Sequence, residues 1–169
     1  MKLRLIAAAV LMTDQELLMM KRSPSRSLSP GVWAAVGGHM EPGEMASPRE
    51  AVLREIAEET GIPSSRITGL TLRYILIRQK ENEIRQQFMY FGRISRLTLP
   101  ACDEGTLHWI PFSEVLDREI PFTYRSMLEH YFTHGEAKHV WIGTISQAGS
   151  DEDSKPQAFW SPLRDPGVH

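Results

Sequence analysis

The chain begins with two apolar runs that have the length and composition of β-strands. They cover residues 2–13 and 16–22, and the polar residues between them predict a hairpin. Residues 23–31 contain four serines, two prolines and a glycine, which is typical of a loop. Residues 32–36 form a further short strand candidate, which ends at Gly37 and Gly38.

The second half of the chain continues with strand-like segments. Two β-rich stretches, 70–79 and 84–95, are separated by four polar residues and are expected to pair as antiparallel strands. Another strand is expected at 138–145, followed by a polar tail from residue 146. Within this tail, 157–160 could return as an edge strand and make a late hairpin, whereas 162–169 are expected to be frayed.

A predicted helix from residue 48 to residue 60 has complete start and stop signals. Ser47 can serve as the N-cap, Pro48 occupies the first helical position, and Glu50 completes a capping box. Gly61 can end the helix in the left-handed conformation, and Pro63 follows it.

A second helix is expected over residues 122–133, because Tyr124, Met127, Leu128 and Tyr131 recur at the spacing of one helical face. A short strand at 107–110 and a short helix starting within 113–116 are expected before it. Strands and helices in this order predict one domain, residues 1–169, of the α/β (α+β) class. It should be an α/β/α sandwich with a mixed central sheet and helices on both faces.

The composition is that of a soluble globular protein, with 41% hydrophobic and 24% charged residues among 169. The formal net charge of −2 gives no sign of nucleic-acid binding, so no nucleic-acid partner is expected. The single cysteine, Cys102, excludes an intramolecular disulfide and fits a reducing, cytoplasmic location. Lys2 and Arg4 precede an apolar run that loosely resembles a signal peptide. The run is too short to span a membrane, and we interpret it as a buried strand.

The candidate chemistry lies on the helix 48–60. Glu55, Glu58 and Glu59 are spaced i, i+3 and i+4, so they fall on one face, beside the apolar face of Val52, Leu53, Ile56 and Ala57. Three carboxylates within one turn repel each other, and hard divalent cations such as Mg²⁺ prefer this density of oxygen ligands. Alone, such a triplet is most often a solvated acidic face. The preceding Gly-Gly pair, and Arg54 as a possible carboxylate clamp, favour a functional site.

Residues 38–44, followed by residues 54–62, resemble the sequence box of the Nudix family. The family pattern is Gly, five residues, Glu, seven residues, Arg-Glu-aliphatic-x-Glu-Glu-x-Gly-aliphatic, and every named position is filled. One departure is clear, since nine residues rather than seven separate Glu44 from Arg54. We interpret Met45-Ala46 as an insertion in the loop before the helix. An insertion in the loop leaves the carboxylate face of the helix unchanged. The usual spacing between Glu44 and Arg54 is lost, however, so the spacing no longer supports a role for Glu44.

The resemblance implies a Nudix-like fold and a hydrolase that depends on Mg²⁺ or Mn²⁺. By this resemblance Glu55, Glu58 and Glu59 bind the metal ions, with the Gly37 carbonyl and Glu104 as further ligands. An ordinary turn acid is the alternative for Glu104, which lies in an Asp-Glu-Gly sequence.

Catalytic roles also follow from the resemblance. Glu55 or Glu104 is expected to act as general base, with Glu55 favoured, and Arg54 is expected to orient an acid rather than touch substrate. Lys21 and Arg22 end the second strand and could meet phosphates; solvated cations at a strand end are the alternative.

Two further residues near the box are substrate-binding candidates. Trp33 could stack on a base, although a core position is the commoner use of tryptophan. Gly38 belongs to the Gly-Gly pair, which can bring the backbone close to a ligand.

The box does not identify the substrate. The proline that ADP-ribose members carry after the box is missing from 74–79, Tyr74 is early for the tyrosine of dinucleoside polyphosphate members, and the coenzyme A signature is only partial in 17–26. These exclusions favour the MutT-type group, which acts on (deoxy)nucleoside triphosphates, including oxidised forms such as 8-oxo-dGTP. An ADP-ribose, other sugar-nucleotide or dinucleotide pyrophosphatase is the alternative.

Two other classes share the fold. A non-catalytic nucleotide sensor usually has lost box acids or gained a DNA-binding domain, and neither applies here. An isomerase of the isopentenyl diphosphate type would need a cysteine before the box, whereas Cys102 follows it. A small nucleotide substrate is therefore expected, with no membrane partner and with monomer and homodimer both open.

Overall fold

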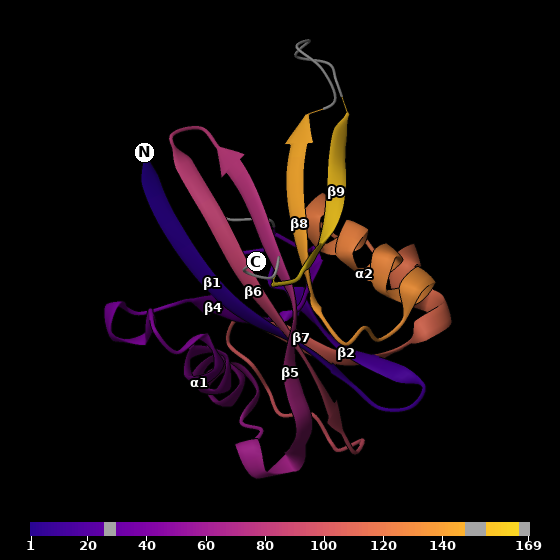
Figure 1. The fold of residues 1–169 in the computed structure, drawn as a ribbon. Coiled ribbons are helices and arrows are strands. Elements are labelled where there is room, and N and C mark those ends of the chain that lie inside the picture. The colour runs from indigo at the N-terminus through magenta and orange to yellow at the C-terminus, as the bar shows by residue number, and fades with distance from the viewer. Residues whose placement is uncertain (26–29, 148–154, 166–169) are drawn as a thin grey trace.

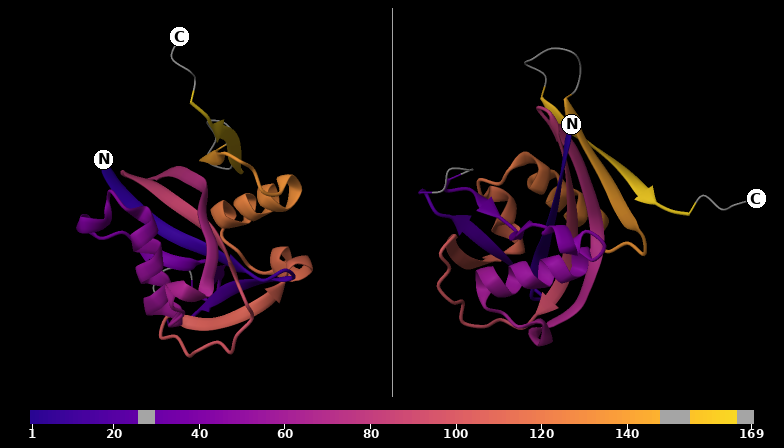
Figure 2. Two further views of the ribbon diagram at one scale, coloured as in Figure 1. Left: turned by 60° about the horizontal axis from the view of Figure 1, so that its bottom comes forward. Right: turned by 90° about the vertical axis from the view of Figure 1, so that its left-hand side faces the viewer.

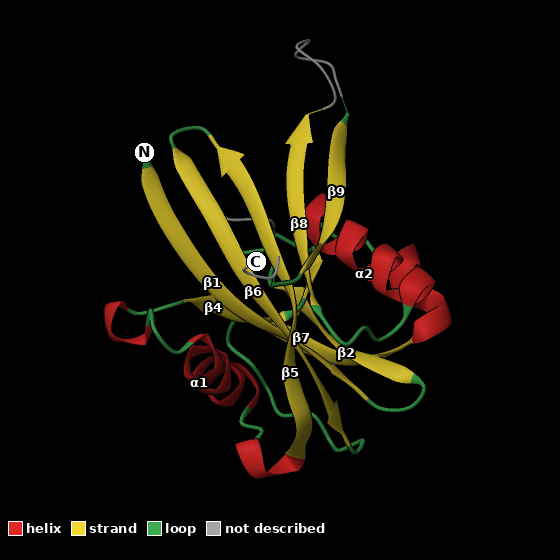
Figure 3. Ribbon diagram, in the orientation of Figure 1, coloured by secondary structure: helices red, strands yellow, loops and turns green. Residues whose placement is uncertain are grey.

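The computed structural model describes residues 1–25, 30–147 and 155–165, and within them nine strands form one mixed sheet (Figures 1 and 3). The helices are α1 (Pro48–Thr60) and α2 (Phe122–His134), with short 3₁₀ turns η1 (Pro42–Glu44), η2 (Ser64–Arg66) and η3 (Phe112–Asp117). The strands are β1 (Lys2–Met12), β2 (Glu16–Arg22), β3 (Trp33–Ala34), β4 (Val36–His39), β5 (Ile67–Lys80), β6 (Glu83–Ile94), β7 (Gly105–Pro111), β8 (Val140–Gln147) and β9 (Pro156–Leu163).

The sheet runs in the order β3-β2-β1-β6-β5-β8-β9, with β4 beside β1 and β7 beside β2. Strands β1 and β6 are parallel, as are β5 and β8, while the other pairs are antiparallel, so the predicted mixed sheet is confirmed. The predicted hairpins β1–β2 and β5–β6 are also confirmed. Strands β1 and β2 separate after the single register pair Met12–Leu17, which opens a fork that β4 enters beside β1.

The single strand predicted at 32–36 is wrong, because the chain divides there into two strands. Strand β3 pairs with β2, and β4 pairs with β1. The connecting chain must change partner because β1 and β2 diverge. The two glycines lie inside β4 rather than after a strand, and Gly37 permits an unusually close approach to β1. A Cβ there would lie 2.4 Å from the carbonyl oxygen of Ala7.

Helix α1 has the predicted limits but not the predicted cap. Ser47 occupies the N-cap position, yet its side chain makes no capping hydrogen bond, so the capping box with Glu50 is not formed. A capping box is present one turn earlier instead, between Glu41 and Glu44 at η1. Gly61 ends α1 in the left-handed conformation with φ 67°, as predicted.

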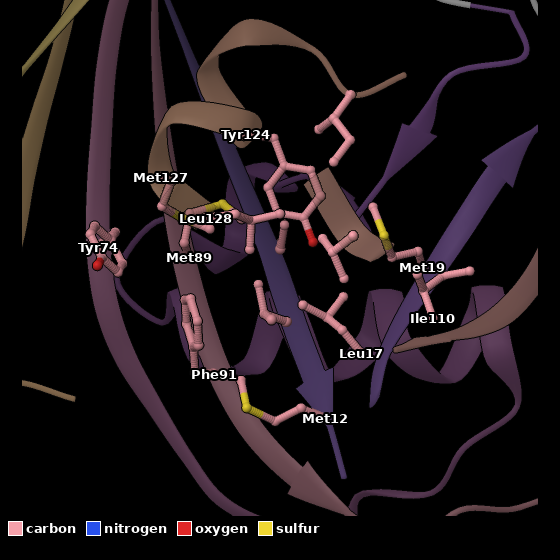
Figure 4. Packing of buried hydrophobic residues seen from close by; sticks show 14 of the residues in the cluster. Met12, Leu17, Met19, Tyr74, Met89, Phe91, Ile110, Tyr124, Met127 and Leu128 are labelled. Atoms are coloured by element: carbon pink, nitrogen blue, oxygen red, sulfur yellow. The ribbon is translucent and has the colours of Figure 1, made fainter. Parts of the chain in front are cut away.

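The two helices cover opposite faces of the sheet, each over its own apolar core (Figure 2). Helix α1 buries Val52 and Ile56, whereas Ala57, predicted on the same face, is exposed. Helix α2 directs Tyr124, Met127 and Leu128 at the strands (Figure 4). Neither helix combines the length and apolar character that a membrane span requires, within the residues described.

The C-terminal segment forms the predicted late hairpin, since β9 pairs antiparallel with β8 from Val140–Leu163 to Gln147–Pro156. Pro162 and Leu163 belong to β9, so the expectation that they are frayed is wrong, whereas 166–169 lie outside the described residues. The pairing extends the sheet past β5 and gives α2 a further strand to pack on.

We expect His130 of α2 to make the fold sensitive to acid. Its side chain is buried beside Trp160 and within 2.9 Å of the Tyr74 hydroxyl, and burial lowers the pKa of His130 from 6.5 to about 4. As the pH falls, the imidazole of His130 is protonated in the unfolded chain before it is protonated in the folded protein, so acid favours unfolding. The contribution of His130 to stability is therefore complete above pH 6.5 and is lost as the pH falls toward 4.

Urea unfolding at pH 7 and pH 5 should show a loss of about 1 to 2 kcal/mol from this group. The variant His130→Gln should lose that much less stability between the two values than the wild type. Equal losses in both proteins would exclude His130 as the source.

Candidate functional site

The fork between β1 and β2 brings α1 and β4 into contact. The backbone N–H of Gly37 in β4 donates a 2.8 Å hydrogen bond to Oε2 of Glu59, whose residue is only 9% exposed. The Glu59 carboxylate is therefore held inside the fold by the backbone N–H of Gly37.

Arg54 joins the acids of this region into one network. Its Nε and Nη2 donate to the two carboxylate oxygens of Glu44 at 2.7 and 2.9 Å, a bidentate arrangement. Its Nη1 donates to Glu55 at 2.9 Å and to Glu58 at 3.0 Å. One guanidinium thus fixes three carboxylates, which agrees with the orienting role expected for Arg54.

The extra residues Met45-Ala46 do not prevent Glu44 from reaching Arg54. They form a turn closed by a 2.8 Å hydrogen bond from the Ser47 N–H to the Glu44 carbonyl, and Met45 is 59% exposed. The insertion is accommodated outside the helix, as the sequence predicts, and Glu44 keeps its contact.

The three helical carboxylates differ in their exposure to solvent. The side chains of Glu55 and Glu58 are 13% and 59% exposed, respectively, and Glu59 is buried. Within the described residues, no three acidic, histidine or cysteine side chains form a ready-made metal cage. Glu55 and Glu58 nevertheless converge, since both accept a hydrogen bond from Nη1 of Arg54, whereas Glu59 is held by the Gly37 N–H.

The electrostatics at Glu59 and Glu55 are those of a crowded acidic site. Burial raises the pKa of Glu59 to about 8. The neighbouring Glu104 and Glu55 also raise this pKa, whereas the hydrogen bond from Gly37 lowers it. Burial also raises the pKa of Glu55, against the lowering effect of Arg54. A positive ion near these oxygens would relieve both the desolvation and the repulsion.

Glu104 reaches the site from a different part of the chain. It lies in the turn before β7, its backbone oxygen accepts a 3.0 Å hydrogen bond from the Ser23 N–H, and its carboxylate acts on Glu55 and Glu59. The expected association of Glu104 with the helical acids is thus present in space.

A cleft of about 220 Å³ opens on the α2 side of the same fork. Gly37 and Arg22 line it together with Arg78, Gln87 and Tyr124. The Nε atoms of Arg22 and Arg78 and the hydroxyl of Tyr124 are buried without a hydrogen-bond partner among the described residues. Such atoms are costly unless a ligand satisfies them, so the cleft is the best-equipped binding space near the acids.

Not every predicted substrate residue faces this cleft. Lys21 does not line the cleft; its Nζ lies 5.8 Å from the ring centre of Trp33, and the residue lines a separate hollow beside Asp103. Trp33 itself packs against the α2-side core and stacks edge-on with His108 at 5.0 Å. A larger hollow of about 690 Å³ lies near Met12 and contains none of the predicted site residues.

Comparison with known proteins agrees with this arrangement. A family model described as the NUDIX domain matches residues 2–159. The chain belongs to the Nudix hydrolase family. The resemblance noted in the sequence is therefore confirmed, and the inserted Met45-Ala46 does not remove the chain from the family.

The fraction of each relative's length that aligns with this Nudix chain varies widely. CTP pyrophosphohydrolase of Escherichia coli (strain K12) is 31% identical over 118 residues, which are 69% of this chain and 82% of that protein. The m7GpppN-mRNA hydrolase NUDT17 of Xenopus laevis is 42% identical over 57 residues, 34% of this chain and only 19% of that protein.

A solved structure gives the same fold. The MutT protein from Bacillus halodurans superposes with a TM-score of 0.71 over 93% of this chain and 97% of that one. At 22% sequence identity, this likeness supports the fold alone.

Sequence reasoning missed the cleft residues of this Nudix chain. Arg78 lies two residues after Leu76 on β5, and Gln87 lies two residues before Met89 on β6. Each therefore shares a strand face with a residue of the α2-side core. A polar residue at a position where the alternation expects an apolar one was the available signal. Tyr124 was predicted on the repeating face of the second helix; it is buried and also lines the cleft.

We expect Gly38→Ala to impair activity without unfolding the protein. A Cβ at Gly38 would lie 2.7 Å from Oε2 of Glu55, so the carboxylate must move, but it is the far end of a side chain rather than backbone. Displacing it by about 1 Å should lower kcat roughly 100-fold. The free energy of unfolding should change by less than about 1 kcal/mol.

Two glycine variants of this Nudix chain provide the comparison. Gly37→Ala should cost about 3 kcal/mol, because its Cβ would meet backbone atoms and its φ is 151°. Gly43→Ala should change neither property, because a Cβ there meets nothing within 4 Å. Unchanged kcat in Gly38→Ala would contradict the placement of Glu55.

Proposed function

We propose that the chain is a metal-dependent pyrophosphohydrolase that cleaves a phosphoanhydride bond in (deoxy)nucleoside triphosphates, oxidised forms such as 8-oxo-dGTP included. The observation that carries the proposal is the position of the Arg54-ordered carboxylates. Glu59, next to them on α1, accepts a hydrogen bond from Gly37, and Gly37 also lines the cleft that presents unpartnered donors from Arg22 and Arg78. Acidic groups that can hold a metal ion and basic groups that can bind phosphates are thus joined through Gly37, as we propose for a metal-bound polyphosphate.

The donor set at the fork fits Mg²⁺ or Mn²⁺. The proposed ligands are Glu55, Glu58, Glu59, Glu104 and the Gly37 carbonyl, all oxygen donors of the kind that these hard ions prefer. The absence of a side chain at Gly38 supports this fit, since a Cβ would fill the space beside the Glu55 carboxylate. When bound, the metal supplies charge neutralisation of the phosphates and a more acidic water.

The protein groups then have separate tasks. Arg54 holds Glu55 and Glu58 in place through charge-assisted hydrogen bonds and does not reach the substrate itself. We assign acceptance of the water proton to Glu55, because burial moves the pKa of its carboxyl upward, in the direction of neutral pH. Glu104 is the second candidate for this role.

The substrate assignment rests on the cleft and on one relative. Arg22 lines the cleft with Gly37, where it can bind phosphates, and the nucleoside would occupy the space lined by Gln87 and Tyr124. The CTP pyrophosphohydrolase of E. coli, matched over 82% of its length, supports a nucleoside triphosphate.

A substrate panel tests the proposal. The purified protein would be incubated with the common nucleoside triphosphates, 8-oxo-dGTP, ADP-ribose and a dinucleoside tetraphosphate, each with Mg²⁺, with Mn²⁺ or with EDTA. Released pyrophosphate and nucleotide products would be quantified. We expect metal-dependent release of a nucleoside monophosphate and pyrophosphate from at least one triphosphate.

Other outcomes would reject the proposal. Preferred cleavage of ADP-ribose or of the dinucleoside tetraphosphate would reject the nucleoside triphosphate as substrate but would leave the proposed hydrolysis of a phosphoanhydride bond in place. Tight binding of a nucleotide without cleavage under any condition would indicate a non-catalytic sensor.

A further inference from the structure

A group of large apolar side chains on β5, β8 and β9 belongs to neither of the two apolar cores. We call these residues the open face: Ile75, Ile77, Val140, Ile142, Phe159 and Leu163. The strand registers place them side by side. Thr144 is the register partner of both Ile77 and Phe159, and Val140 is the partner of Leu163. The open face is therefore one continuous surface across three strands.

The open face lies on the α1 side of the sheet, beyond the part that α1 covers. Ile75 is the register partner of Phe88 in β6, which packs against the α1-side core. Helix α1 packs mainly on β1 and β4, and Figures 1 and 2 show it well away from β8 and β9. Phe159 and Leu163 are accordingly 54% and 52% exposed. The late hairpin thus extends the sheet and leaves one of its faces bare.

The polar residues that share this side of the strands carry no charge. They are Gln86, Thr144, Gln157 and Ser161. The reverse side of the sheet differs sharply, because Arg4, Arg85 and Arg78 are aligned there across β1, β6 and β5. Charged residues are depleted at the centre of protein interfaces, and like charges that face each other oppose association. An uncharged surface can therefore meet an identical surface without repulsion.

The size of the open face suits a modest interface. Leu3 of β1, which is 59% exposed, and its register partner Ile84 of β6 continue the face across two further strands. Over five strands the face measures roughly 20 Å by 15 Å. An exposed apolar patch of about 300 Å² is large enough to serve binding. Two such faces with their polar rims would bury about 1,000 Å² in total, near the lower limit for a specific interface.

The face of β9 is better suited to a partner than its edge. Strand β9 is the outermost strand of the sheet, and it contains Pro156 and Pro162. Proline has no N–H to offer to a further strand, and edge strands that contain it resist strand addition. A partner is therefore expected to pack sheet face on sheet face, at a spacing of about 10 Å, rather than to extend the sheet.

We propose that two copies of this chain pack together through their open faces about a two-fold axis. Such an axis places a surface against its own copy, which the absence of charge on the open face permits. Packing removes Phe159 and Leu163 from water and leaves Thr144 and Ser161 free to form hydrogen bonds between the copies. None of the six apolar residues lines the cleft or is a proposed metal ligand, so the inference is independent of the proposed function.

Sedimentation velocity of the full chain over a concentration series tests the proposal. Between about 1 μM and about 200 μM, the average mass should rise from that of the monomer to that of the dimer, with Kd in the micromolar range. The modest interface area is the reason for this affinity. Raising the salt concentration to about 1 M should not dissociate the dimer, because no charge pairs hold the two faces together.

Two charged variants of exposed residues locate the interface. Phe159→Glu and Thr144→Arg should each raise the Kd of the dimer at least about tenfold, because the interface would bury unpaired charges. Met45→Glu is the matched control, since Met45 is 59% exposed and lies in the loop before α1, outside the open face. Its Kd should equal that of the wild type. Urea unfolding should show that all three variants remain folded, because each replaced side chain is exposed.

Three results would overturn the inference. One is a wild type that stays monomeric up to about 200 μM. If that monomer bound phosphatidylcholine vesicles, the open face would belong to a lipid surface instead of a second copy. Another is a dimer whose Kd is the same in Phe159→Glu, in Thr144→Arg and in the wild type. The third is a dimer that dissociates in high salt, since charge pairs outside the open face would then hold it together.

Discussion

Replacing Glu55 by glutamine should lower kcat for nucleoside triphosphate hydrolysis about 1,000-fold while leaving the protein folded. Glutamine keeps the size of the side chain but cannot accept the water proton and is a poorer ligand for Mg²⁺. The Glu55 carboxylate is largely buried and faces Gly38, so no other described side chain can take its position without moving. Steady-state kinetics with Mg²⁺ and urea unfolding, on the same preparation, measure both effects.

Two other glutamates on α1 provide graded controls. Glu50→Gln changes an exposed residue in the first turn of α1 and should retain wild-type kcat. Glu58→Gln should give an intermediate loss, because the Glu58 side chain is 59% exposed and turned toward Arg54. If Glu55→Gln were no slower than Glu50→Gln, neither proposed role of Glu55 would stand.

Arg54→Lys should lower kcat about 10- to 100-fold and the free energy of unfolding by about 1 to 2 kcal/mol. Lysine keeps the positive charge but cannot form the bidentate contact with Glu44 and at the same time hold Glu55 and Glu58. The loss should appear in kcat more than in KM, because Arg54 positions carboxylates and does not bind substrate. Kinetics and unfolding of the variant measure both losses.

A double-mutant cycle with Glu44 tests whether these effects share one network. Glu44→Gln and Arg54→Lys should couple by about 0.5 to 3 kcal/mol in stability. The matched cycle of Arg54→Lys with Glu50→Gln should show no coupling. Additive losses in the first cycle would mean that the 2.7 Å contact between Arg54 and Glu44 contributes nothing.

The elements that could be predicted from the sequence are those fixed by local signals. The limits of α1 follow from Pro48 and Gly61, and the β5–β6 hairpin follows from two β-rich stretches around a short polar turn. Helical spacing placed Glu55, Glu58 and Glu59 together on α1, and in the structure Glu55 and Glu58 both contact Arg54 while Glu59 contacts Gly37.

The remaining features depend on long-range geometry. The division of 32–36 into β3 and β4 follows from the divergence of β1 and β2, and no local pattern encodes that divergence. The burial of Glu59 depends on the backbone of Gly37 in a distant strand, and the cleft depends on Arg78 and Tyr124 meeting from distant segments. The alignment of Arg4, Arg85 and Arg78 across three strands likewise appears only when the strand register is known.

Mn²⁺ binding followed by electron paramagnetic resonance, with CTP turnover measured on the same samples, tests the central claim most directly. In the wild type, turnover should rise in proportion to bound Mn²⁺ and vanish with EDTA. Glu59→Gln removes a buried carboxylate held by Gly37, so it should lose both Mn²⁺ binding and turnover. Full-rate hydrolysis in EDTA, or unchanged Mn²⁺ binding in both Glu59→Gln and Glu55→Gln, would contradict a metal-dependent site on these carboxylates.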